Sequence, residues 1–152
     1  MIDSGHELND ASEAAAMDIE VERSIEAAPR MVYDAWFDTA QPGGPWFGCE
    51  RVIITPQVGG LFHHSVRHEN RSWAHYGRFV RLEPPDLIVQ TWVSEATGGV
   101  ETLLELTFTP EGARTRMSLR HTDVPDDPMG RRHEEGWGYV LDSLSARFTP
   151  SN

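Results

Sequence analysis

Apolar and polar side chains alternate from Met17 onward, as they do along a β-strand with one buried face. Three apolar residues share one face and three glutamates the other: Ile19, Val21 and Ile25 against Glu20, Glu22 and Glu26. A short helix is predicted next, over residues 29–37, because Pro29 suits a first helical turn and apolar residues recur behind it at helical spacing. The run QPGGPWFG, residues 41–48, then predicts a loop or a brief second helix.

From Arg51 to about Asp123 the pattern is that of strands joined by short turns. The runs VGG, ENRS, EPPD, ATGG and PEG are typical of such turns. Consecutive strands on connections this short must pair antiparallel. The predicted strands cover residues 51–55, 61–68, 75–82, 87–93, 100–109 and 114–121.

A long amphipathic helix is predicted from about Pro128 to Phe148, with Asp126 or Asp127 as its N-cap. Its apolar stripe contains Trp137, Val140, Leu141, Leu144 and Phe148. Gly136 and Gly138 flank the tryptophan, although each glycine costs a helix interior about 1 kcal/mol relative to alanine. Two explanations remain open: the helix starts late or kinks there, or it passes close to neighbouring chain and leaves space beside Trp137.

This order of elements predicts an α+β fold. A twisted antiparallel sheet that is apolar on one face needs a cover, and the last helix is the long element available to cover it. Residues 17–150 are expected to form one domain, which agrees with a length of 152 residues. We interpret residues 1 to about 16, which are small, polar and acidic, as a disordered or weakly helical tail.

The composition excludes several classes of partner and compartment. With 13 basic and 24 acidic residues the formal net charge is −11, which disfavours nucleic acid and anionic membranes as partners. No stretch is long and apolar enough to span a membrane, and the N-terminus lacks the features of a signal peptide. The single cysteine, Cys49, is typical of a protein from the reducing cytoplasm.

Several runs of the sequence resemble one superfamily in their order and spacing. They are IEVERSIEAAPRMVYDAW, PWFG, VGGLFHHSV, YGRFVRLEPPDLIVQTW and HEEGWGYVLDSL. The chain is similar, from about Asp18 to Phe148, to the SRPBCC or START-like superfamily, and within it to the branch named after the activator of the heat-shock-protein-90 ATPase. The resemblance implies the helix-grip fold, in which a curved sheet wraps the C-terminal helix and encloses a pocket.

Strand alternation and the resemblance together predict which residues face this pocket. Alternation puts Phe62, His64 and Val66 on one face, and it does the same for the apolar residues of the later strands. The resemblance places four tryptophans at the pocket wall or its mouth. The expected ligand-contacting residues are Trp36, Trp46, Phe47, Phe62, His64, Val66, Trp92, Leu104, Met117, Leu119, His121, His133 and Trp137.

Three histidines of this set could converge, but their spacing does not favour metal binding. The sequence contains no HxH, HxxxH or CxxC pair, and His63 and His64 are adjacent, so they face opposite sides of a strand. We therefore expect no metal and no cofactor. A hydrogen bond from His64 or His121 that orients a ligand and a satisfied core histidine are both compatible with the pattern.

Three functions follow, from different classes. The first is a small soluble protein, monomeric or homodimeric, that holds an apolar or aromatic small molecule between the sheet and the C-terminal helix. The alternative is a polyketide cyclase or aromatase that uses polar groups of the same cavity as acid and base. The third is a chaperone ATPase activator, which rests on the name of the family branch. We expect no catalytic residues, because no nucleophile motif or phosphate-binding loop is present.

Overall fold

The computed structural model describes residues 16–40, 45–46 and 48–150. The strands are β1 (Ala16–Ile25), β2 (Arg51–Ile54), β3 (Leu61–His68), β4 (Arg71–Glu83), β5 (Leu87–Ser94), β6 (Thr102–Glu111) and β7 (Arg114–Pro125). The helices are α2 (Pro29–Trp36), the short 3₁₀ turn η1 (Glu95–Thr97) and α3 (Pro128–Phe148). The predicted N-terminal tail lies outside the described residues, except for Ala16, which already belongs to β1.

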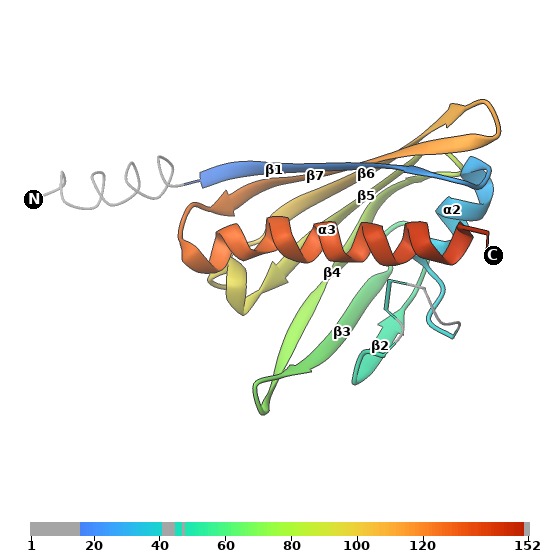
Figure 1. The fold of residues 1–152 in the computed structure, drawn as a ribbon. Helices are drawn as coiled ribbons and strands as arrows, with labels where there is room; N and C mark the ends of the chain where they lie inside the picture. The colour runs from blue at the N-terminus through green and yellow to red at the C-terminus, as the bar shows by residue number, and fades with distance from the viewer. Residues whose placement is uncertain (1–15, 41–44, 47, 151–152) are drawn as a thin grey trace, which may run out of the picture.

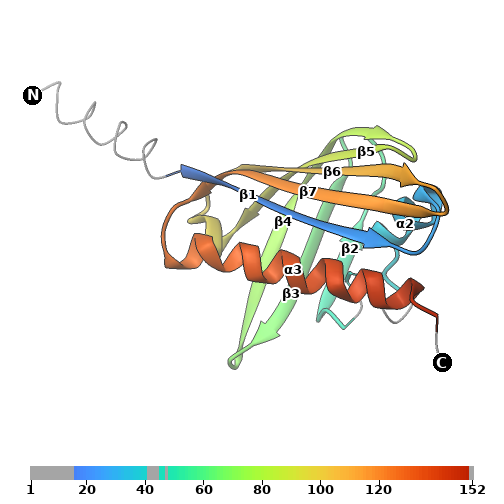
Figure 2. The same ribbon diagram turned by 45° about the horizontal axis from the view of Figure 1, so that its top comes forward.

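All seven strands of the described chain pair antiparallel in one sheet, in the order β1-β7-β6-β5-β4-β3-β2. The first strand therefore lies beside the last, and β2 forms the opposite edge. The sheet curves, and α3 runs along it and packs on β1 and β7 (Figures 1 and 2). The α+β fold with a curved sheet and a long C-terminal helix is confirmed.

The faces predicted from alternation are also confirmed on the later strands. Thr102, Leu104, Leu106 and Phe108 of β6 are all buried, as are Thr115, Met117, Leu119 and His121 of β7. The β6–β7 register places Leu106 directly opposite Leu119 and Phe108 opposite Met117. These cross-strand pairs form the floor of the core, because side chains opposite each other on one face lie close enough to pack.

The turn between β3 and β4 is tighter than the sequence predicted. The strand expected to begin at His75 begins at Arg71, because Glu69 and Asn70 alone make the reversal. Both have positive φ, 52° and 64°, which is the backbone of the two-residue hairpin turn that matches strand twist. Asparagine tolerates this region well.

The last helix has the predicted bounds, and Asp127 is its cap. The Asp127 Oδ1 accepts a hydrogen bond from the Gly130 backbone N–H at 2.7 Å. Gly130 is needed for close approach, because a Cβ there would lie 1.7 Å from the Pro125 carbonyl oxygen. Since the helix already begins at Pro128, the explanation of Gly136 and Gly138 by a late start is wrong.

The explanation by close packing beside Trp137 is wrong as well. A Cβ at Gly136 would have no neighbour within 4 Å, and one at Gly138 would meet only the Arg23 guanidinium, at 3.5 Å. Gly138 faces a polar surface groove of about 530 Å³ between β1 and α3, lined also by Glu20 and Arg131. The two glycines therefore leave open space outside the domain, whereas Trp137 points into its interior.

Replacing Gly136 with alanine is expected to stabilise the protein. The position is helical, exposed and without neighbours, so Gly136→Ala should raise the free energy of unfolding by about 1 kcal/mol. Urea unfolding would measure the change. Gly130→Ala is the matched variant on the same helix and should destabilise instead, because its Cβ would clash with backbone. A loss of stability in Gly136→Ala would contradict the open surface described here.

Candidate functional site

The predicted pocket residues converge on a buried cluster of aromatic rings between α2, α3 and the sheet. Trp36 comes from α2, Trp92 from β5 and Trp137 from α3, and each is at most 3% exposed. Trp46 joins them from the segment between α2 and β2, outside any helix or strand. The Trp46 ring centre lies 4.9 Å from that of Trp36 and 4.5 Å from that of His64. The resemblance had placed the four tryptophans at the pocket, and strand alternation had placed His64 there.

Trp92 is the centre of this aromatic cluster. Its ring centre lies 4.7 Å from that of Trp137, 5.3 Å from that of His64 and 5.6 Å from that of Phe62. The Trp92 indole N–H is buried and has no hydrogen-bond partner among the described residues. An indole can only donate, so a buried N–H without an acceptor costs free energy comparable to a lost hydrogen bond.

The other buried indole groups are satisfied. Trp36 donates to the Gln90 Oε1 at 2.9 Å, and Trp46 donates to the Trp36 carbonyl oxygen at 2.6 Å. Gln90 is 1% exposed, and the sequence analysis missed it. Alternation along β5 could have found it, because Gln90 lies between Ile88 and Trp92 on the inward face.

A hydrogen-bond chain determines the protonation state of His121. The Trp137 Nε1 donates to the His121 Nδ1 at 3.0 Å, so Nδ1 must be unprotonated. Neutral His121 then carries its proton on Nε2 and donates to the Thr102 Oγ1 at 2.7 Å. The Thr102 hydroxyl in turn donates to the Trp92 carbonyl oxygen at 2.6 Å. A second proton on His121 would face the Trp137 N–H, donor against donor.

Four histidines of the cluster have pKa values shifted below their ordinary value, mainly through burial. Burial, with a smaller effect of His75, lowers the pKa of His64 to about 3. Burial lowers the pKa of His75 to about 4, although a hydrogen bond to the His64 backbone opposes this. Burial, with a smaller effect of the nearby His133, lowers the pKa of His121 to about 3. Burial also lowers the pKa of His133. All four are neutral at pH 7.

His75 belongs to this set, although the sequence analysis did not include it. Its ring stacks on that of His64, 4.7 Å between centres, because the two residues are opposite each other in the β3–β4 register. Alternation from Phe79 back along β4 would have placed His75 on the inward face.

The rings fill the interior of the domain. The cavity that they leave, lined by Trp36, Trp46, Phe62, His64 and Gln90, has a volume of about 10 Å³. That is at most enough for one water molecule. An occupant larger than water therefore needs one of these side chains to move.

The remaining predicted residues have less direct relations to this cavity. Leu104, Met117 and Leu119 are fully buried in the sheet floor. His133 is buried and its Nδ1 donates to the Gly130 carbonyl oxygen at 2.9 Å. Val66 is 37% exposed, at the rim of the cluster, and Phe47 lies outside the described residues.

The buried histidines of the cluster are poorly matched to acid–base chemistry at pH 7. An imidazole with a pKa of about 3 is a weak base at pH 7, far from the match that efficient proton transfer needs. In the described part of the chain no three histidine, cysteine, aspartate or glutamate side chains are placed to hold a metal ion. No described helix is long and apolar enough to cross a membrane.

Comparisons with known proteins give one family and a common fold. A family model described as "Activator of Hsp90 ATPase homolog 1-like protein" matches residues 26–149. Protein CV1439 from Chromobacterium violaceum is 24% identical, with a TM-score of 0.73, over 88% of this chain and 98% of that one. CalU16 from Micromonospora echinospora is 25% identical, with a TM-score of 0.66, over 89% and 78%. No curated protein sequence matches this chain.

A third solved structure carries a functional description of its own. PFC0360w from Plasmodium falciparum, described as an HSP90 activator, is 18% identical to this chain. Its TM-score is 0.71, and the match covers 86% of this chain and 95% of that one. At this identity the similarity shows the fold.

Proposed function

Since this chain belongs to the family of Activator of Hsp90 ATPase homolog 1-like proteins, we propose that it binds an aromatic small molecule in the interior between the sheet and α3. The ligand carries a hydrogen-bond acceptor, and its ring takes the place of the Trp46 indole. The observation that carries the proposal is the buried Trp92 N–H, which has no acceptor among the described residues at the centre of an aromatic cluster.

Trp46 is the ring of the cluster that a ligand can replace at least cost. Three of the tryptophans belong to helices or strands that hold their backbone in place: Trp36 in α2, Trp92 in β5 and Trp137 in α3. Trp46 lies outside them, and it borders the small cavity together with Phe62 and Gln90. An aromatic ring at its place would keep the contacts with His64 and Trp36, and an acceptor oxygen on that ring could reach toward the Trp92 N–H.

The burial of so many hydrogen-bonding groups supports this assignment. Pockets for small molecules combine apolar walls with a few polar groups that orient the ligand. Here Gln90, Thr102 and His121 lie within an otherwise aromatic interior, each at most 2% exposed. A core built for stability alone has no need of this many polar side chains, because each must be matched to avoid a desolvation cost.

The two rival functions rest on other grounds. A cyclase or aromatase would use His64 or His121 as a base, and their low pKa values oppose that role. A role as a chaperone ATPase activator is supported by the family description and by the description of the Plasmodium falciparum structure. That role needs a protein surface and does not depend on the cavity.

Binding of 2-naphthol, followed by tryptophan fluorescence and by the melting temperature, tests the proposal. The wild type should bind, and Trp46→Ala should bind at least about tenfold more tightly, because the ligand no longer has to displace a ring. Naphthalene, which lacks the oxygen, should bind more weakly to both. Trp92→Phe should remove most of the preference for 2-naphthol over naphthalene.

Trp73→Ala is the matched control. Trp73 lies outside the cluster on β4, where its Nε1 donates to the His68 carbonyl oxygen. This variant should bind 2-naphthol as the wild type does. If Trp46→Ala binds 2-naphthol and the wild type does not, Trp46 is a core residue and the proposed function is wrong. Absence of binding to both proteins has the same consequence.

A further inference from the structure

The outer face of the sheet, opposite the aromatic cluster, has two halves that differ in how their arginines are paired. On β1 and β7 the outward arginines form ion pairs with carboxylates. Arg116 lies 2.7 Å from Glu22 and Arg120 lies 2.9 Å from Asp18. Arg114 lies within 3.5 Å of Glu26. This half is a solvated network of compensating charges.

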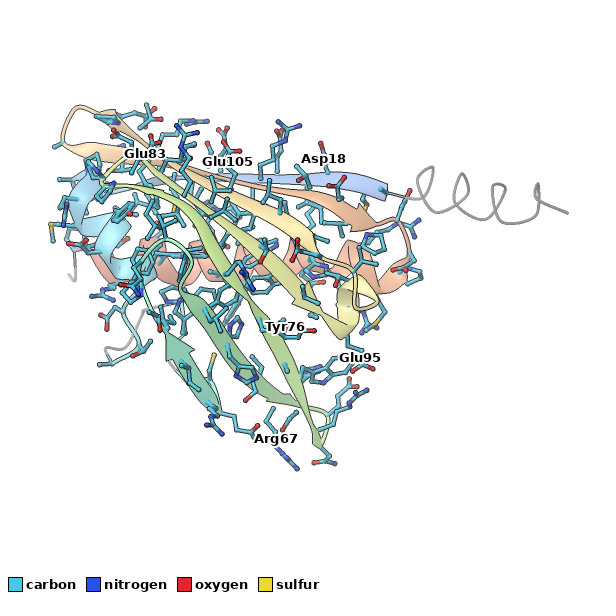
Figure 3. The ribbon with its side chains drawn as sticks, turned by 180° about the vertical axis from the view of Figure 1, so that it is seen from behind. Asp18, Arg67, Tyr76, Glu83, Glu95 and Glu105 are labelled. Carbon is cyan, nitrogen blue, oxygen red and sulfur yellow. The ribbon has the colours of Figure 1, made fainter. Side chains whose placement is uncertain are left out.

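The other half, on β2, β3 and β4, combines exposed apolar side chains with arginines. Because Phe62 and His64 point into the core, the residues that alternate with them point outward. The register places Ile53 opposite His63, His63 opposite Tyr76, and Leu61 opposite Arg78. We call this surface the wing face, and its residues are Arg51, Ile53, Leu61, His63, Tyr76 and Arg78. Figure 3 shows Tyr76 on this side of the sheet.

Charge on the chain is distributed unevenly around the wing face. Residues 50–83 contain five arginines and three acidic residues, whereas the rest of the chain contains eight arginines against 21 acidic residues. Glu50 pairs with Arg67 and Glu83 pairs with Arg81. Within the part of the chain that the structure describes, no carboxylate forms an ion pair with Arg51 or Arg78, whereas Arg67, Arg71 and Arg81 all have one.

Exposed apolar side chains gather in the same region. Among the described residues, six of the nine exposed large hydrophobic side chains lie between residues 53 and 80, and three of these six belong to the wing face. Ile53, Leu61 and Tyr76 of the wing face are 47%, 58% and 49% exposed. Isolated exposed apolar residues are ordinary, but a group of them beside unpaired charge is typical of an interaction surface.

We propose that the wing face binds an acidic polypeptide segment of a partner protein, in which aliphatic or aromatic residues alternate with carboxylates. The carboxylates pair with Arg51 and Arg78, and the apolar side chains cover Ile53, Leu61 and Tyr76. Charge complementarity selects this occupant, because the two guanidinium groups have no ion-pair partner among the described residues and attract carboxylates. The strong net negative charge of the rest of the molecule keeps the segment on this face.

Selection of short peptides from a random library on the immobilised wild type tests this proposal. The library is counter-selected on the double variant Arg51→Glu/Arg78→Glu. We expect peptides with alternating acidic and apolar residues to be enriched. For the enriched peptide, fluorescence anisotropy should give a Kd at least about tenfold higher for the double variant, and the affinity of the wild type should fall with added salt.

Arg30→Glu/Arg114→Glu is the matched control, since it changes the net charge equally at arginines that already pair with Asp34 and Glu26. Its Kd should stay close to that of the wild type. The proposal is overturned if acidic peptides are not enriched, or if both double variants weaken binding equally. It is also overturned if sedimentation shows a wild-type dimer that Arg51→Glu/Arg78→Glu dissociates, because the occupant is then a second copy of this chain.

Discussion

Lowering the pH from 7 to 5 is expected to remove on the order of 5 kcal/mol from the free energy of unfolding. The cause is the burial of neutral histidines. Folded His64, His75 and His121 have pKa values of about 3, 4 and 3, whereas an unfolded chain binds the same protons near pH 6.5. Domains of this kind have total stabilities of about 5–15 kcal/mol, so the loss is close to unfolding.

The protein loses stability as the pH falls because the unfolded state binds more protons than the folded state. Below about pH 6.5 these histidines bind protons in the unfolded chain, whereas in the folded chain they stay neutral until about pH 3 to 4. The stabilisation by these histidines is therefore complete above about pH 6.5 and is lost as the pH falls from about 6.5 to about 3 to 4. The neighbours of His64 and His121 include further histidines, His63 and His133, which oppose protonation in the same direction.

Urea unfolding at several pH values measures this effect, and two variants test its assignment. His64→Gln should reduce the slope of stability against pH by about 1.4 kcal/mol per pH unit between pH 5 and 6. Gly136→Ala, which changes no titratable group, should leave the slope as it is. A stability that is flat from pH 7 to pH 5 would mean that these histidines are not buried as described.

Replacing Trp137 with alanine is expected to cost about 3–5 kcal/mol. The side chain is 3% exposed and packs against Trp92, so its loss leaves a cavity in the aromatic cluster. It also removes the donor to the His121 Nδ1, which leaves a buried acceptor without a partner. Thermal and urea unfolding would measure the cost.

Two further variants separate packing from hydrogen bonding. Trp137→Phe keeps an aromatic ring but loses the N–H, so it should cost about 1–3 kcal/mol. In that variant the depressed pKa of His121 should rise, because the Nδ1 is no longer held as an acceptor. Tyr139→Ala, on the same helix and 75% exposed, should change stability by less than about 0.5 kcal/mol. Equal losses in Trp137→Ala and Tyr139→Ala would contradict the buried cluster.

Local pattern was sufficient to predict the elements, their order and most inward-facing residues. Period-2 alternation placed Leu104, Met117 and Leu119 in the core, and all three are buried. Asp127 could be proposed as a cap from its position alone, because a cap bonds to backbone only a few residues away. These features depend on contacts between residues that are near in sequence or on the face of one strand.

What surrounds each inward side chain was decided by the tertiary structure. His75 meets His64 only through the β3–β4 register, and Gln90 receives the Trp36 N–H across 54 residues of chain. The same pattern of tryptophans was compatible with an open pocket or a filled one. The tertiary structure decides for the filled one, because rings from four separate segments pack together and leave a cavity of about 10 Å³.

The glycines of α3 show most clearly the difference between what the sequence determined and what the tertiary structure decided. The sequence alone determined that Trp137 lies on the apolar stripe of the last helix, because helical spacing sets which residues share a face, but it left open whether that helix begins before Gly136 and Gly138. It could not determine what lies opposite them. What lies opposite the two glycines depends on where β1 runs relative to α3. The structure places only an open groove and the Arg23 side chain opposite them. No local pattern could show this, because the packing of a helix on a sheet is set by contacts between residues far apart in the sequence.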